Sequence, residues 1–405
     1  MKRQVIKETL TYMWRNKKNR LVIVLCFGAI ILHSLLILPN TPGVEEVNIE
    51  AMERSMEGNR QTFEDNLEDG VTIPTMMTGT SAYEVARNEY VNQRELLTAL
   101  ETGDVRRYLD IPYRDASGGG GTEDDEGLSF FSILGTPKEM DYQHIKESAY
   151  VDLVDPLSFH IVHNRTSLQQ LHLFFIGLGP YILVFLLLFM VSDVTTKDRK
   201  LSTQKAGVPI NWFGYLLLQS LAGLGFVLLF FLALSSVFIL LNGLLHGFGT
   251  FQLPVGQFMA NPPGEPFYLS GPGLMPLGEF FLKVLPYLVL LLYGFTRLTT
   301  LFSLLLKHDV IVLLASLFVL LFPQLYFGEG VRELMGYSVS WFPQTYFHFG
   351  DVATGAVSLL AWEFVPYTRG LIVLGVTIVI IECFTYIASR KIKRQAFVGV
   401  MPKVL

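Results

Sequence analysis

Two charged side chains, Arg297 and Glu382, lie inside long apolar segments, where charge is costly. Arg297 comes ten residues before Lys307, and Glu382 comes eight residues before Arg390. At about 1.5 Å of rise per helical residue, both side chains would lie at a similar depth from the same membrane face. This spacing predicts an intramembrane polar pair. A structural ion pair, or an Arg297 that reaches the interface, is one interpretation, and a polar element of a path across the membrane is the other.

Motifs for other chemistry are missing from the sequence. The chain has no phosphate-binding G-x-x-x-x-G-K-[ST] loop, no H-E-x-x-H and no G-x-S-x-G. His160, His163 and His172 have mixed spacing and no carboxylate cluster beside them, so they predict no metal site. Cys26 and Cys383 fall inside apolar segments, which argues against a disulfide framework. We therefore predict that the chain is not an enzyme and holds no metal or cofactor of its own.

The elements that must position the charged pair are long apolar helices. Hydrophobic residues make up 51% of the chain, and the mean hydropathy is +0.40. About 20 apolar residues cross a hydrocarbon core of about 30 Å, and in lipid the backbone must bond within its own segment. The sequence predicts an all-α polytopic membrane protein with six transmembrane helices. They are expected at 21–38, 171–191, 212–241, 284–306, 310–327 and 371–388.

Positive charge is concentrated in four parts of the chain, with an even number of predicted spans between consecutive clusters. Because cytoplasmic loops are rich in Lys and Arg, all four clusters and both termini are predicted to be cytoplasmic. The acidic insertion at 41–170, with 25 Asp/Glu against 10 Lys/Arg, is predicted to lie outside with 243–278 and 328–367. The clusters are 2–20, 197–205, 307 and 390–403.

The predicted domains follow from this topology. Residues 1–20 are expected to form a basic amphipathic helix at the membrane surface, with Ile6, Leu10, Met13 and Trp14 on one face. The first span, 21–38, is expected to remain as an anchor, because no cleavage site follows it.

The extracytoplasmic insertion is predicted to be mainly helical, with helices at 44–66 and 82–108 and a flexible acidic loop at 118–126. The Gly- and Pro-rich stretch 243–278 is predicted to be a loop. Residues 171–405 are predicted to form a five-helix membrane domain that contains a cytoplasmic loop, 192–210, and an outer segment, 328–367.

Two segments carry a resemblance to a known family. The stretch 195–218 (TTKDRKLSTQKAGVPINWFGYLLL) resembles the cytoplasmic loop of ABC type-2 exporter permeases, and 341–355 (WFPQTYFHFGDVATG) resembles the re-entrant signature before their last span. The span order resembles the sodium-export and peptide-export branches of Gram-positive bacteria. The resemblance implies a coupling site at Lys197, Arg199, Lys200, Gln204, Lys205, Val208 and Pro209. It implies a re-entrant site at Pro343, Tyr346, Phe347 and Gly355.

The resemblance also implies partners and a location. Such a permease sits in the cell membrane as a multi-pass protein, in contact with lipid. It works with two copies of an ABC ATPase subunit, which bind the ATP and Mg²⁺, and with a second permease that is identical or homologous. The expected function is export of a peptide, lipid-like molecule, drug or ion, with no role for nucleic acid.

Two other functions remain open from the sequence. One is a non-transporting sensor or immunity protein whose insertion, 41–170, binds an extracellular ligand. The other is a secondary transporter, which is disfavoured because no inverted repeat is evident. The acidity of the insertion makes a cationic peptide a candidate ligand or substrate through long-range attraction. The identity of the substrate is not encoded in any motif of the chain.

Overall fold

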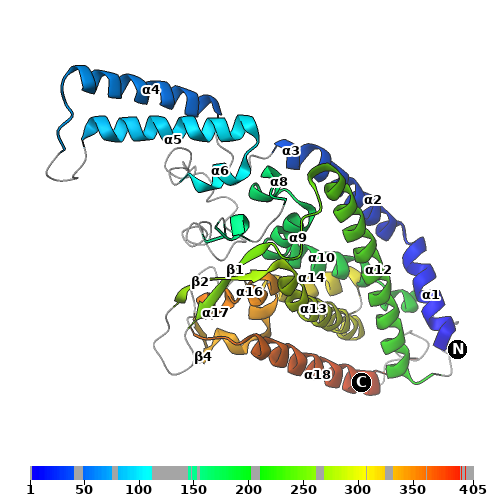
Figure 1. The fold of residues 1–405 in the computed structure, drawn as a ribbon. Helices are drawn as coiled ribbons and strands as arrows, with labels where there is room; N and C mark the ends of the chain where they lie inside the picture. The colour runs from blue at the N-terminus through cyan, green and yellow to red at the C-terminus, as the bar shows by residue number, and fades with distance from the viewer. Residues whose placement is uncertain are drawn as a thin grey trace.

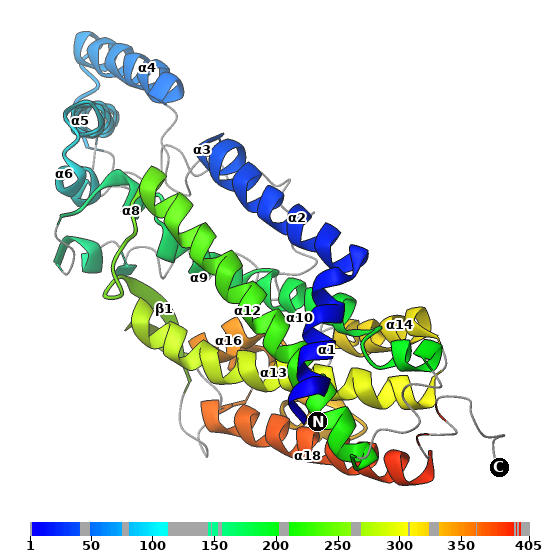
Figure 2. The ribbon, with the colours of Figure 1, turned by 90° about the vertical axis from the view of Figure 1, so that its right-hand side faces the viewer.

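The structure is a computed structural model of the 405-residue chain. The residues that it describes are 2–40, 49–74, 81–111, 145–146, 148–152, 156–201, 210–260, 269–306, 308–323, 332–361, 363–392, 394 and 397. Nearly all regular structure among these residues is helical, with two small β-hairpins. Figures 1 and 2 show a bundle of long helices from which one helical hairpin projects.

Five helical segments among the described residues are long and apolar enough to cross a membrane. The first, Lys17–Asn40, contains α2 (Lys17–Leu32), a π-helical turn (His33–Ile37) and α3 (Leu38–Asn40). These spans confirm an all-α membrane protein. The others are Gly179–Arg199, which begins with α10 (Gly179–Val191), then α12 (Trp212–His246), α13 (Leu277–Leu305) and α18 (Tyr367–Lys391).

The predicted span at 310–327 corresponds to a shorter helix, α14 (Asp309–Leu321). Its 13 residues reach about 20 Å, less than the thickness of a hydrocarbon core. Residues 324–327 lie outside the described part of the chain. A sixth crossing therefore stays a prediction.

The two ends of the described chain meet at one end of the bundle. Val5 of α1 (Lys2–Arg15), Trp212 at the start of α12 and Leu304 near the end of α13 belong to one buried cluster. Phe397, beyond α18, belongs to the same cluster. The bundle thus has its N-terminal helix and the end of its last span on one side, and which side of the membrane this is stays a prediction.

The predicted second span, 171–191, is wrong at its beginning. The chain forms α9 (Ser167–Ile176), breaks at Gly177, and starts again as α10 at Gly179. The sequence Gly-Leu-Gly-Pro explains the break, because Pro180 lacks a backbone donor and favours the first turn of a new helix. Hydropathy alone does not register such a break, since Gly and Pro interrupt the helix without making the segment polar.

The predicted loop at 243–278 is also wrong in part. It contains an antiparallel hairpin of β1 (Pro254–Ala260) and β2 (Leu269–Pro276), in which Val255 pairs with Met275. Both of these side chains are buried in the main core. High Gly and Pro content is typical of a loop, and neither strand has the strict apolar–polar alternation that predicts a strand.

The N-terminal helix α1 packs differently from the sequence expectation. Of the predicted apolar face, Met13 is fully buried, with its sulfur beside Gly223 of α12, whereas Trp14 is 61% exposed. Val5 and Thr9 complete the buried face. Helix α1 packs against α12, and the face buried in this contact is not the face with the most apolar residues.

The insertion contains α4 (Ile49–Glu68), α5 (Ala82–Thr102), α6 (Val105–Asp110) and α8 (Phe159–Val162). Figure 1 shows α4 and α5 side by side, standing away from the bundle. Helix α5 starts with a capping box between Ser81 and Glu84. A separate small core holds the hairpin to α8, formed by Met52, Leu96, Ala99, Val105, Tyr108, Ile111 and Val162. The predicted flexible loop at 118–126 lies outside the described residues.

The segment before α18 is built from short elements. A two-residue hairpin of β3 (Glu333–Leu334) and β4 (Tyr337–Ser338) leads into helical turns η4 (Val339–Trp341) and η5 (Pro343–Tyr346). Two short helices, α16 (Phe349–Thr354) and α17 (Val357–Ala361), follow. This segment packs mainly against α9, α13 and α18.

Candidate functional site

The two charged residues singled out by the sequence are in direct contact. Arg297 of α13 is fully buried, and its Nε lies 2.5 Å from Oε1 of Glu382 on α18. Its Nη2 donates to Oε2 of the same carboxylate at 2.7 Å. This is the two-bond geometry that a guanidinium and a carboxylate favour. The ion pair joins α13 to α18.

Two neutral side chains complete this polar cluster. Arg297 Nη1 donates to Ser220 Oγ of α12 at 2.8 Å, and the Tyr293 hydroxyl donates to Glu382 Oε1 at 2.6 Å. The ring of Phe213 lies 5.6 Å from the guanidinium carbon. The cluster therefore links α12, α13 and α18. The sequence analysis missed Tyr293, although it lies one helical turn before Arg297 and so shares its face.

The predicted coupling residues Lys197 and Arg199 face the interior of the protein. Lys197 is 6% exposed, with its ammonium 4.0 Å above the Tyr12 ring. Arg199 Nη2 donates to the carbonyl of Ser303 on α13 at 3.0 Å, and its guanidinium lies 4.3 Å from the Phe397 ring. These two cations therefore hold residues 197–199 against other parts of the same chain. Of the other predicted coupling residues, Lys200 is described in its backbone only, and Gln204, Lys205, Val208 and Pro209 lie outside the described residues.

Asp193, two residues after the end of α10, is contacted by three donors from the N-terminal region. Tyr12 and Asn16 donate to its Oδ2 at 3.0 and 2.6 Å, and Lys18 Nζ lies 3.3 Å from Oδ1. Burial and the nearby Asp193 charge raise the pKa of Tyr12, so its hydroxyl stays a donor. Asp193 thereby fixes the junction between α1 and α2.

Asp198, in the 3₁₀ turn η3 (Thr196–Leu201), makes the corresponding contacts with α12. It is 1% exposed, and its Oδ2 accepts from the Tyr215 hydroxyl at 2.8 Å and from Gln219 Nε2 at 3.2 Å. Residues 193–199, which we call the tethered segment, are therefore bonded to α1, α2, α12 and α13. The sequence analysis assigned no role to Asp193 or Asp198, because polar contacts between distant segments leave no local pattern.

The predicted re-entrant residues lie together in the segment between α14 and α18. Pro343 starts η5, and the fully buried Tyr346 donates to the carbonyl of Ser340 at 2.6 Å. Phe347 packs edge-on against Phe295 of α13, with ring centres 5.0 Å apart. Gly355 has a φ of 83°, and an added Cβ would lie 2.7 Å from the Phe258 carbonyl of β1. Only Gly fits there without strain.

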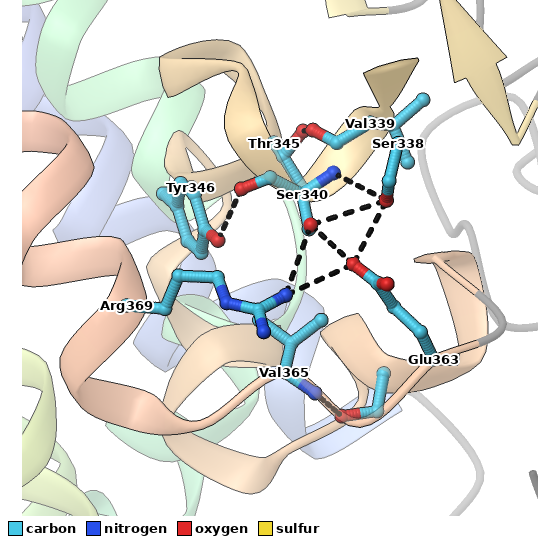
Figure 3. A network of polar contacts seen from close by, with 9 residues as sticks. Ser338, Val339, Ser340, Thr345, Tyr346, Glu363, Val365 and Arg369 are labelled. Carbon is cyan, nitrogen blue, oxygen red and sulfur yellow. Dashed lines mark hydrogen bonds and ion pairs between the residues drawn. The ribbon is translucent and has the colours of Figure 1, made fainter. Parts of the chain in front are cut away.

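Figure 3 shows a second polar network beside these residues. The Glu363 carboxylate accepts from Ser338 Oγ at 2.8 Å, from Ser340 Oγ, and from Arg369 Nη1 at 2.9 Å. The Arg369 guanidinium lies 5.3 Å from the Trp341 ring. The sequence analysis assigned no role to Arg369, whose side chain the structure places in this network.

A small cavity of about 70 Å³ lies where the insertion meets the bundle. Lys146 and Tyr150 line it from the insertion, and His172 of α9 lines it from the bundle, with its ring edge-on to Phe280 at 4.5 Å. The space suits about two water molecules and is far smaller than the pockets that hold drug-sized ligands. Among the described residues, no group of three or more His, Cys, Asp or Glu side chains could hold a metal ion.

Comparison with known proteins adds no relative. The chain matches no family model, and neither a curated protein nor a solved structure is significantly similar to it. What the chain does is therefore to be inferred from its own residues and contacts.

Proposed function

We propose that this chain is the transmembrane permease subunit of an ATP-driven exporter, with ATP hydrolysed by a separate subunit. The observation that carries the proposal is the tethered segment, 193–199. Buried contacts bond it to α1 and α2 through Asp193, to α12 through Asp198, and to α13 through Arg199. A displacement at this end of the bundle would be passed to several helices at once, because packed interiors transmit strain.

This arrangement suits a mechanical handle. A subunit that consumes ATP outside the membrane must move membrane helices through a small area of contact. The tethered segment leads directly into residues 200–210, which belong to the stretch that resembles the coupling loop of ABC type-2 permeases. In the proposal the ATPase subunit contacts 200–210, while Lys197 and Arg199 pass its movement inward.

The proposal includes a second permease, because so few spans rarely enclose a path alone. The polar cluster of Arg297 and Glu382 would then hold α12, α13 and α18 as one moving unit. Because the cluster is internally paired, it contributes rigidity rather than a binding site for a charged substrate. The proposed cargo remains a peptide, lipid-like molecule, drug or ion.

Purification of the intact chain tests this function. The tagged full-length protein is extracted from its source membrane in a mild detergent, and its partners are identified by mass spectrometry. We expect an ATP-binding subunit in equal amount, and ATP hydrolysis in the purified complex. Recovery of the chain without any nucleotide-binding subunit, and without ATPase activity, contradicts the proposal.

A second candidate function is a non-transporting sensor, and one observation favours it. The hairpin of α4 and α5 stands away from the bundle and has its own small core, as a ligand-binding module would. The insertion that contains it is strongly acidic, with 25 Asp/Glu against 10 Lys/Arg. A sensor would bind a cationic peptide with no ATPase subunit in the complex, so the same purification separates the two functions.

A further inference from the structure

A buried His and Asp face each other at the start of α16. The His348 Nδ1 atom lies 2.8 Å from Asp351 Oδ2, and the opposite ring atom, Nε2, lies 2.8 Å from the carbonyl oxygen of Gly177. The two side chains are 6% and 8% exposed. Gly177 belongs to the break between α9 and α10, far away in the sequence.

Both nitrogens of this imidazole therefore face oxygen atoms. A neutral imidazole has one N–H donor, so it can bond only one of them. The Gly177 carbonyl can only accept, which places a hydrogen on Nε2. The contact with Asp351 is then attractive only if a second proton lies between Nδ1 and the carboxylate, on either atom. The geometry thus favours one bound proton beyond those of a neutral His and a charged Asp.

The contact joins two chain segments that approach closely. A Cβ on Gly350 of α16 would lie 2.2 Å from the Phe175 carbonyl at the end of α9, so the two backbones are nearly in contact there. The Phe349 ring also packs against Phe175, with centres 5.6 Å apart. Through these contacts α16 covers the break between α9 and α10.

We propose that His348 and Asp351 form a proton-binding site that holds α16 onto the break between α9 and α10. When the proton leaves, a buried carboxylate faces a ring lone pair, and an unpaired buried charge is costly. Separation of α16 from Gly177 relieves this cost by admitting water. The site is thus a pH-sensitive latch on the outer segment, and it does not depend on the proposed export function.

The surroundings leave Asp351 as the dominant charge. Among the described residues, α10 contributes the Tyr181 ring, 5.9 Å from the imidazole, while α9 contributes the Gly177 carbonyl. On either side of α16, Phe347 packs against the Phe295 ring of α13, and Gly355 lies against the Phe258 carbonyl of β1. Among the described residues, Asp351 is the charged side chain that acts most strongly on the ring.

The pKa of His348 is shifted in the direction that this latch requires. Burial alone would lower it, but the Asp351 carboxylate and the Gly177 carbonyl outweigh burial and raise the pKa above its ordinary value. The folded chain therefore holds the proton more tightly than the unfolded chain. The resulting stabilisation is complete below about pH 6.5 and is lost as the pH rises through the raised pKa.

Hydrogen–deuterium exchange of the full chain in lipid nanodiscs tests the latch without a substrate. Exchange is followed by mass spectrometry at about pH 6 and about pH 9, corrected for the intrinsic rate, in peptides that cover α16 and α13. We expect the protection of α16 amides to fall about tenfold at the higher pH, while that of α13 stays constant. Equal protection of α16 at both pH values overturns the proposal.

Two variants and one control sharpen the test. Asp351→Asn keeps the shape and supplies an N–H donor to Nδ1 without a titrating proton, so α16 should stay protected at both pH values. His348→Gln should lower protection at both. His308→Gln, a change at the exposed His before α14, should retain the response of the unaltered chain. A full pH response in Asp351→Asn would show that another group titrates and would overturn the assignment.

Discussion

Two Arg–Glu pairs attach α18 to its surroundings, and they differ in burial. Arg297 and Glu382 have side chains 0% and 23% exposed and make two parallel bonds inside the bundle. Arg369 and Glu363 have side chains 26% and 37% exposed, make one bond of 2.9 Å, and share the carboxylate with two Ser hydroxyls. The chemical groups are the same, but their access to water is not.

The comparison shows that the contribution of such a pair to stability depends on what surrounds the remaining charge when one partner is removed. In the inner pair, removal of Glu382 leaves the Arg297 charge where water cannot reach it, and breaking a buried pair is strongly destabilising. In the outer pair, water replaces the lost partner, so the pair contributes little by itself. The following substitutions separate these two regimes.

The largest effect is expected from the inner pair. Glu382→Gln should lower the free energy of unfolding by about 3 kcal/mol, because it leaves the buried Arg297 guanidinium without its counter-charge. Unfolding of the purified chain in mixed micelles with increasing SDS measures the change. Adding Arg297→Gln should cost little more, since the pair is already broken. Additive losses from the two substitutions would show that the residues act independently.

An intermediate effect is expected at Asp198, a buried carboxylate whose Oδ2 accepts from Tyr215 and Gln219. Asp198→Asn should cost about 1–2 kcal/mol, because the amide cannot accept as strongly from Tyr215 and Gln219. In the proposed complex it should also lower transport more than ATP hydrolysis, since the tethered segment is loosened. Asp309→Asn, at the exposed start of α14, is the matched control. An equal effect of both changes would remove the case for a handle at 193–199.

The smallest effect is expected from the outer pair. Glu363→Gln should change the free energy of unfolding by no more than about 1 kcal/mol, because both side chains are partly hydrated and the amide can still bond Ser338. The same SDS titration measures it. A loss as large as that of Glu382→Gln would contradict the role assigned to burial.

Local patterns predicted the long elements of the fold well. Apolar length located the spans, and polar residues with good helix propensity located α4 and α5. The matched depth of Arg297 and Glu382 brought them together in the prediction, because helical rise converts sequence distance into depth. The coupling residues show the limit of this reasoning. Lys197 and Arg199 read as exposed loop cations, whereas their partners, the Tyr12 ring and the Ser303 carbonyl, belong to distant segments.

The sequence by itself determined that this chain belongs in a membrane and is built of helices, since both follow from local hydropathy and from the need of a backbone in lipid to satisfy its own hydrogen bonds. Only the tertiary structure decided that α16 lies on the break at Gly177, that Asp193 and Asp198 hold the tethered segment, and that Glu363 receives Arg369. These contacts join residues far apart in the chain. Their geometry depends on how whole helices pack, which no local pattern records.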